Sequence, residues 1–318
     1  MFDKKKVLRS VSLGMSTVVL VGAGLLSGCS PAPADNGTGG AGNVTPSPSP
    51  TVQENKNDKI MPGFMALLGE KTKPAVLIEY MDKNIAAVSK EDASRMLMEL
   101  EKAQQNYQKT LEEKYYAANI QESLGKIFSK DMSLDKINDT QDPALKKLLE
   151  ETGSMGYKVE TAEGMFFPIQ DYGYLKKFSP YAGDDIKAYI DIMAVESEKV
   201  PAKDAALVIS WDEVLERAFS QEAYIEKYSS SPKLDSVKEL YSKYRTFILF
   251  GLNNTPLFAY EDKAMDKEAR AAFEKAAKGN DGSGLGQLLG SYMKVIEKNG
   301  YKLTDEVDNF RKKIDDKK

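Results

Sequence analysis

The chain has 318 residues, with 44 basic and 48 acidic side chains, one cysteine and no histidine. This composition excludes Ser-His-Asp and Cys-His catalysis, zinc sites built from histidine and cysteine, haem ligation through histidine, and internal disulfide bonds. The acidic excess also argues against a nucleic-acid partner, which would need a basic face. No cofactor or metal is expected.

Residues 1–28 have the pattern of a signal peptide. Lys4, Lys5, Lys6 and Arg9 precede the uncharged, apolar residues 11–26, which is the order of a charged and then a hydrophobic region in an export signal. A permanent transmembrane helix is the weaker interpretation, because this stretch contains three glycines and is shorter than the roughly 20 residues that a spanning helix needs.

The end of this stretch, Leu26-Ser27-Gly28-Cys29, is an aliphatic residue, two small residues and the single cysteine of the chain. It resembles the lipobox of bacterial lipoproteins, and with the lysine-rich start it is similar to those of Gram-positive, Bacillus-like organisms. The resemblance implies cleavage before Cys29, attachment of a diacylglyceryl group with palmitate-type acyl chains to Cys29, and a lipid anchor on the extracytoplasmic face of the cell membrane. Two or three acyl chains hold a protein much more firmly than one.

Residues 29–58 have the composition of a tether. They are rich in proline, glycine and serine, with Thr-Pro-Ser-Pro-Ser-Pro at residues 45–50, and a flexible chain of this length reaches on the order of 30 Å. Residues 59–318 form the expected extracytoplasmic domain. Without residues 1–28, which hold four basic residues and one acidic residue, the net charge is −7, so the lipid rather than the protein surface is expected to contact the membrane.

Helical periodicity dominates this domain and predicts a mostly α, irregular multi-helix fold. The longest helix is expected over residues 90–117, where Leu97, Leu100, Tyr107 and Leu111 share a face that Gln104 interrupts. Caps or apolar spacing predict further helices that begin near Asp142-Pro143, Asp184, Ser210, Ser231-Pro232, Leu285 and Asp305. Ser210 and Glu213 have the spacing of a capping box. Alternation around Gly164 predicts one β-hairpin over residues 157–169, in which Pro168 requires an edge strand.

Aromatic side chains are concentrated between residues 164 and 181. Tyrosine offers flat apolar area and a hydroxyl group at little entropic cost, which suits recognition of peptides or glycans. The alternative is that these side chains pack into the core. For binding we expect Phe166, Tyr172 and Tyr174 to be partly exposed. The candidate binding residues are Phe166, Phe167, Tyr172, Tyr174, Phe178 and Tyr181.

Three classes of function remain open. The favoured one is a noncatalytic binding protein of the cell envelope, held at the membrane by its lipid, whose partner is another envelope protein, a peptide or a glycan. The second is the substrate-binding lipoprotein of an importer, although such proteins usually alternate strands and helices in two lobes. The third is a carboxylate-based glycan or cell-wall hydrolase. Its candidate acids near the aromatic segment are Asp171, Asp184, Asp185 and Asp191.

Overall fold

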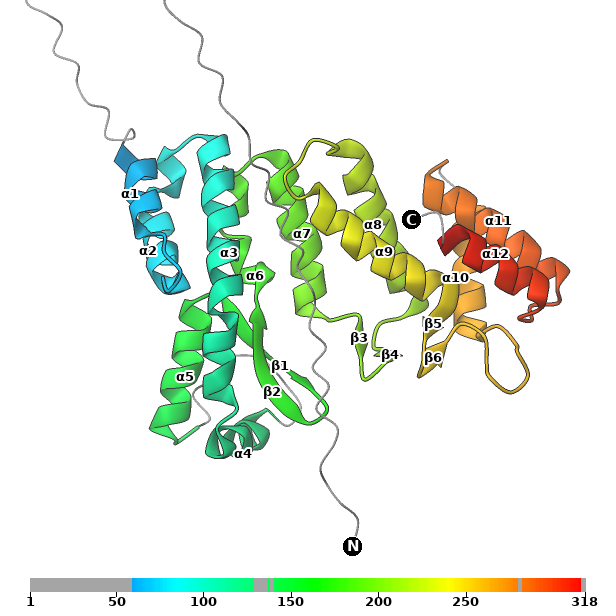
Figure 1. Cartoon of the computed structure of the whole chain (residues 1–318), viewed down its shortest axis with the longest axis horizontal. Coiled ribbons are helices and arrows are strands. Elements are labelled where there is room, and N and C mark those ends of the chain that lie inside the picture. The colour runs from blue at the N-terminus through cyan, green and yellow to red at the C-terminus, as the bar shows by residue number, and fades with distance from the viewer. Residues whose placement is uncertain (1–58, 129–136, 138–139, 280–281, 316–318) are drawn as a thin grey trace, which may run out of the picture. The chain divides into compact units, whose positions relative to one another are not determined.

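The computed structural model of the chain describes residues 59–128, 137, 140–279 and 282–315, which all belong to one compact unit, residues 53–318. Helices dominate this part of the chain, and its three sheets have two strands each (Figure 1). The prediction of a mostly α domain with a β-hairpin is therefore confirmed. None of the described helices is long and apolar enough to cross a lipid bilayer.

The first half of the domain packs around two apolar cores that share one long helix, α3. Its elements, in chain order, are α1 (Ile60–Leu67), α2 (Pro74–Asn84), the 3-10 turn η2 (Ile85–Ala87), α3 (Lys90–Tyr115), α4 (Ala118–Ile127), α5 (Pro143–Ser154), β1 (Tyr157–Ala162), β2 (Met165–Gln170), α6 (Tyr172–Leu175), the 3-10 turn η4 (Ser179–Tyr181) and α7 (Asp184–Glu198).

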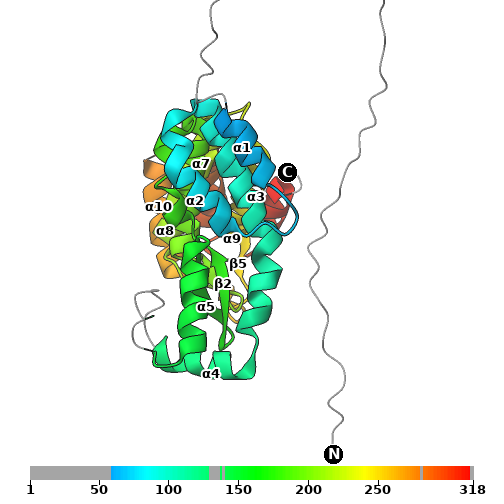
Figure 2. The same ribbon diagram turned by 90° about the vertical axis from the view of Figure 1, so that its left-hand side faces the viewer.

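Helix α3 begins where Ser89 accepts a hydrogen bond from the backbone N–H of Asp92 (3.1 Å). Its first half packs with α1, α2, α6 and α7, and its second half packs with α4, α5 and β1 (Figure 2). Gln104 lies where the two cores meet. Its amide is fully buried and donates to the carbonyls of Met155 (2.9 Å) and Gly156 (3.1 Å). The polar interruption in the sequence pattern is therefore a buried glutamine that holds the chain between α5 and β1.

The predicted hairpin is present and extends to Gln170. Glu163 and Gly164 both have positive φ angles (50° and 75°), as the tight turn between two twisted antiparallel strands requires. The sheet has only two strands, so the edge position that Pro168 needs is available, and its carbonyl accepts a hydrogen bond from Gln108 (2.5 Å).

The second half of the domain has its own core, in which Trp211 packs edge-on against Phe273 at 5.8 Å between ring centroids. Two-residue hairpins connect some of its helices, and these hairpins were not predicted. The elements are β3 (Ala202–Lys203), β4 (Ala206–Leu207), α8 (Trp211–Lys227), α9 (Leu234–Phe250), β5 (Gly251–Leu252), β6 (Thr255–Pro256), α10 (Lys267–Lys278), α11 (Gly284–Lys298) and α12 (Asp305–Asp315).

Two details of the predicted helix starts are wrong. Ser210 caps α8 by accepting from the N–H of Glu213 (3.2 Å), but the Glu213 carboxylate binds Arg217 (2.5 Å) instead of completing the capping box. Helix α9 begins at Leu234 rather than at Ser231. Ser231 belongs to the preceding turn, because its hydroxyl accepts from the N–H of Lys233 (3.2 Å) and donates to Asp185 (2.7 Å).

A buried ionic cluster links the start of α9 to α3. The Glu101 carboxylate, 3% exposed, forms an ion pair with Lys233 and accepts hydrogen bonds from the hydroxyls of Tyr172 and Tyr189. Burial raises the pKa of both tyrosines, which therefore remain hydrogen-bond donors. Because a buried carboxylate is costly unless it is paired and hydrogen-bonded, this cluster depends on all of its members.

Candidate functional site

The six aromatic residues that the sequence singles out do not form one surface. Phe166 and Phe167 are half-buried on β2, and the Phe166 ring lies 6.3 Å from that of Phe128 in the core beside α4. Tyr172 and Phe178 are buried (5% and 2% exposed) in the core around α1, α2 and α7. The remaining two, which reach solvent, are Tyr174, partly buried, and Tyr181, 42% exposed.

Of the three residues expected to be partly exposed, Phe166 and Tyr174 are, and Tyr172 is not. The hydroxyl of Tyr172 is used by Glu101. The acids Asp171 and Asp184 lie at helix starts, where Asp171 caps α6 by accepting from the N–H of Tyr174 (3.2 Å). The lipobox residues Leu26, Ser27, Gly28 and Cys29 lie outside the described residues.

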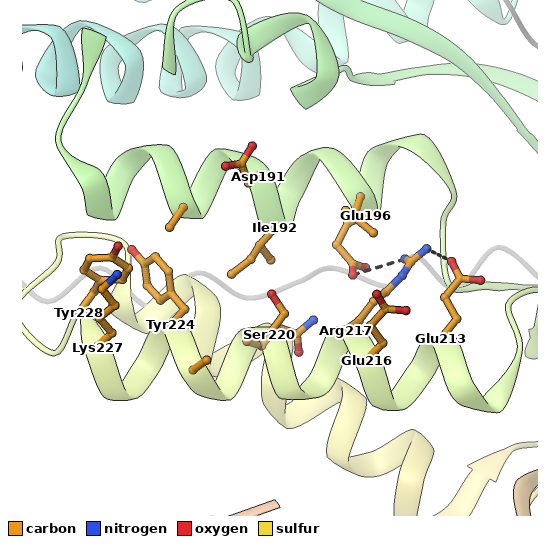
Figure 3. Close-up of a pocket in the computed structure, with 14 residues that line it drawn as sticks. Asp191, Ile192, Glu196, Glu213, Glu216, Arg217, Ser220, Tyr224, Lys227 and Tyr228 are labelled. Carbon is orange, nitrogen blue, oxygen red and sulfur yellow. Dashed lines mark hydrogen bonds and ion pairs between the residues drawn. The ribbon is translucent and has the colours of Figure 1, made fainter. Parts of the chain in front are cut away.

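A groove of about 650 Å³ lies elsewhere, between the neighbouring helices α7 and α8. Figure 3 shows it, with Ile192 and Glu196 on α7 pointing toward the side chains of α8 and Asp191 at the outer side of α7. We call it the α7–α8 groove. Its volume is within the range of about 300–1,000 Å³ typical of small-ligand sites. It lies where the first half of the domain meets the second, a common location for binding sites.

Small side chains explain the open middle of the groove. Ala188, Ile192 and Val195 follow one another along α7 at helical spacing, and Ser220 and Ala223 line the groove from α8. Alanine and serine cannot fill the space between two helices whose ends are held together by larger groups. The result is a short aliphatic wall, in which Val195 is 45% exposed.

Charged groups close one end of the groove. The Arg217 guanidinium, 5% exposed, contacts Glu213 (2.5 Å) and Glu196 (3.4 Å) and donates to the carbonyl of Lys199 (2.9 Å). Burial raises the pKa of Glu196 above its ordinary value, although Tyr244 and Arg217 donate hydrogen bonds to its carboxylate. For Glu213 the bonds from Lys199 and Arg217 outweigh burial and lower the pKa. The two carboxylates therefore differ in basicity.

Gln221 forms part of the groove lining with an amide that has no partner. The residue is fully buried, and neither its Nε2 nor its Oε1 atom makes a hydrogen bond to any described residue. The Nε atom of Arg217, one helical turn earlier, is in the same state. A buried polar group without a hydrogen-bond partner costs about 1–3 kcal/mol of stability, so the Gln221 side chain destabilises the free protein.

Tyrosines close the opposite end. The rings of Tyr224 and Tyr228 lie 5.0 Å apart, and the Tyr224 hydroxyl donates to Ser231 (2.8 Å), which in turn donates to Asp185 (2.7 Å). A second hollow of about 350 Å³ begins here and shares Lys227 and Tyr228 with the groove. It continues to the first turn of α7, so the two hollows together follow most of that helix.

Of the residues that line this groove, the sequence singled out only Asp191, as a candidate acid of a hydrolase. A further signal was present, since Ala188, Ile192 and Val195 are apolar residues at helical spacing. Within the described part of the chain, no group of three or more acidic or cysteine side chains is placed to hold a metal ion. Comparison with protein-family models, with curated proteins and with solved structures found no match for this chain.

Proposed function

We propose that this chain is a noncatalytic binding protein, anchored by a lipid on Cys29 to the extracytoplasmic face of the cell membrane, and that its ligand occupies the α7–α8 groove. The lipobox pattern around Cys29 supports the anchor. The position and volume of the groove support the site.

The assignment of the site rests on one observation, which is that the amide of Gln221 in the groove lining has no hydrogen-bond partner. Buried polar groups in proteins are nearly always hydrogen-bonded, so a group that lacks a partner calls for a reason. A ligand that supplies the missing partners is such a reason, because binding then forms the hydrogen bonds that the amide lacks in the free protein.

Fractionation of cells tests the anchor. Cys29→Ala is expected to move the protein from the membrane fraction, whereas the neighbouring Ser30→Ala is expected to leave it there. The wild type is also expected to incorporate a labelled fatty acid that the Cys29→Ala variant does not. A wild-type protein without acyl chains would contradict the proposal.

Photocrosslinking in intact cells tests the groove. A photoreactive residue at Ser220, exposed on α8 beside the groove, is compared with one at Lys146, exposed on α5. An adduct is expected from Ser220 and not from Lys146. It is expected to disappear when Val195→Trp fills the groove, a change that the exposure of Val195 should allow without unfolding. An adduct that persists in the filled variant would contradict the assignment of the site.

The pair Glu196 and Glu213 favours a second candidate, a carboxylate-based glycan hydrolase, because acid catalysis uses two carboxyl groups of different pKa. It ranks lower because the Arg217 guanidinium binds both carboxylates. Release of sugar from a cell-wall preparation, lost in both Glu196→Gln and Glu213→Gln, would establish it. The importer alternative would require transport that depends on a cognate membrane permease.

A further inference from the structure

We propose that the α7–α8 groove binds a short, basic peptide in an extended conformation, with one of its peptide bonds paired to the amide of Gln221. This inference rests on the proposed function of the groove as a binding site. It adds the chemical class of the ligand, which three properties of the groove define: its unmet hydrogen bonds, its charge and its shape.

The hydrogen bonds that Gln221 lacks are those of an amide. Its Nε2 needs an acceptor and its Oε1 needs a donor, and a peptide bond offers a carbonyl and an N–H. A carboxylate or phosphate would satisfy Nε2 but leave Oε1 without a donor, and it would meet the carboxylate of Glu196 in the same lining. Gln221 is covered in the free protein. Binding therefore requires a change of its rotamer, and this change breaks no hydrogen bond of the amide.

The charge of the lining favours a cation. The groove and the adjoining hollow contain six carboxylates against two cationic groups, Arg217 and Lys227. Arg217 is already used by Glu196 and Glu213. Glu216, exposed on the rim, makes no ion pair with any described residue. The carboxylates are Asp184, Asp185, Asp191, Glu196, Glu213 and Glu216.

Three of these carboxylates also meet lysines outside the lining, but those lysines lie at the surface. Asp184 meets Lys90 at 3.6 Å, Asp191 meets Lys176 at 3.1 Å and Glu213 meets Lys199 at 2.9 Å, and the lysine side chains are 70%, 53% and 54% exposed. Pairs of this kind contribute little and are readily exchanged. A basic ligand would therefore meet a lining with a negative electrostatic potential.

The shape favours a peptide over a glycan. From Asp184 to Glu196 the two hollows follow about 18 Å of helix α7, at about 1.5 Å per residue, which matches about five residues of an extended chain. The middle of the wall is aliphatic, formed by Ala188, Ile192 and Val195. Aliphatic side chains of a peptide pack well there, whereas sugar rings pack best on the flat faces of aromatic rings.

Binding to defined probes tests the proposal. Fluorescently labelled, acetylated and amidated pentapeptide pools carry lysine at two positions, or glutamate at the same two positions, with aliphatic residues elsewhere. Binding to the full-length protein is measured by fluorescence anisotropy at two salt concentrations, with fluorescently labelled, N-acetylated chitopentaose as an amide-bearing probe that contains no peptide bond. Saturable binding of the lysine pool, weakened by salt, and no binding of the glutamate pool are expected.

Gln221→Leu is expected to weaken binding of the lysine pool about tenfold, as the loss of two hydrogen bonds implies. Methylation of the peptide nitrogen that faces Oε1 should weaken binding to the wild type but not further to Gln221→Leu. Glu216→Gln should reduce the salt dependence, whereas Glu239→Gln, exposed on α9 and outside the groove, should not. Gln104→Leu, which removes another buried glutamine, should leave affinity unchanged in the folded fraction.

The outcomes separate this inference from the proposed function. Equal binding of both pools, or binding that Gln221→Leu leaves intact, would overturn the assignment of a basic peptide. Binding of chitopentaose without binding of peptides would replace the peptide by a glycan and leave the groove as the site. If no probe binds while the Ser220 adduct still depends on an open groove, only the ligand class is wrong. If that adduct also fails, both proposals fall.

Discussion

Replacing Gln221 by leucine should stabilise the free protein. The amide is fully buried without a hydrogen-bond partner among the described residues, and such a group costs about 1–3 kcal/mol. Leucine has a similar size and no polar atoms, so Gln221→Leu removes this cost. At about 2–4 °C of Tm per kcal/mol in a domain of this size, the variant should melt at least ~2 °C above the wild type.

The chain offers a matched control in Gln104, the other glutamine that is fully buried in the structure. Gln104→Leu would leave the carbonyl of Met155 without its donor. It would also remove one of two partners from the Gly156 carbonyl, which keeps the N–H of Asp171 (2.9 Å), and from the Gln170 amide, which keeps the Glu101 carbonyl (3.2 Å). At about 1–3 kcal/mol for an orphaned group, this variant should lose at least ~1 kcal/mol of stability. The same substitution is therefore expected to have opposite signs at the two positions.

Thermal melting and urea unfolding of both variants measure this difference, with an unchanged urea m-value as the check that the same transition is followed. If Gln221→Leu lowers stability as Gln104→Leu does, the Gln221 amide is satisfied in solution, and the main support for the groove as a binding site is lost. Higher stability combined with lost binding would instead be the pattern of a residue kept for function.

Three further perturbations test other parts of the structure. Burial raises the folded-state pKa of Glu196 above 4.5. The stability of the wild type relative to Glu196→Gln should therefore be highest below pH 4.5 and should fall as the pH rises through the folded-state pKa. Urea unfolding of both proteins across this pH range measures the difference. Lys233→Met should cost about 3–5 kcal/mol, because it leaves the Glu101 carboxylate buried without its cation. Gly251→Ala should destabilise more than Gly164→Ala. Both glycines have positive φ angles (72° and 75°), but only at Gly251 would a Cβ atom meet backbone, the Thr255 carbonyl at 2.4 Å.

Controls accompany these variants. Lys83→Met removes the cation of an exposed pair with Glu79 (2.6 Å) and should leave Tm unchanged; an equal effect at Lys233 would mean that the Glu101 cluster is not a buried unit. A relative stability that rises with pH in the Glu196 comparison would show that Arg217 outweighs burial. Equal costs at Gly251 and Gly164 would contradict the close approach of strands β5 and β6.

Local signals in the sequence were sufficient for much of the fold. Asp142 and Ser210 cap the helices that their spacing predicts, and the turn at Gly164 locates the hairpin. Helices α1, α2, α4, α6 and α10 were not anticipated. In α4 no side chain caps the N-terminus, and such a helix depends on packing against α3 and α5 more than on local propensity. In α10 a local signal was missed, because Asp266 caps it by accepting from the N–H of Ala269 (2.8 Å).

The groove could not be predicted in the same way. Its lining combines the faces of two helices, and their relative orientation is set by contacts distant in sequence, such as the bond between Asp185 and Ser231 (2.7 Å). Gln221 looks like an ordinary polar residue of an amphipathic helix, and only the folded structure shows that it is fully buried. The prediction of a binding surface in the aromatic segment failed for a related reason. The composition of the segment does not reveal that Tyr172 and Phe178 are buried in the core.

The division of the domain into two consecutive halves has a consequence for the order of assembly. The core around α1, α2 and α7 takes its buried side chains from residues before 195, apart from Tyr224 and Val237, whereas the last core is built only from residues after 208. A chain that is made from its N-terminus onward can therefore fold most of its first half before α8 has been made. The α7–α8 groove forms only when the second half packs against the first. A complete groove therefore requires that both halves have folded.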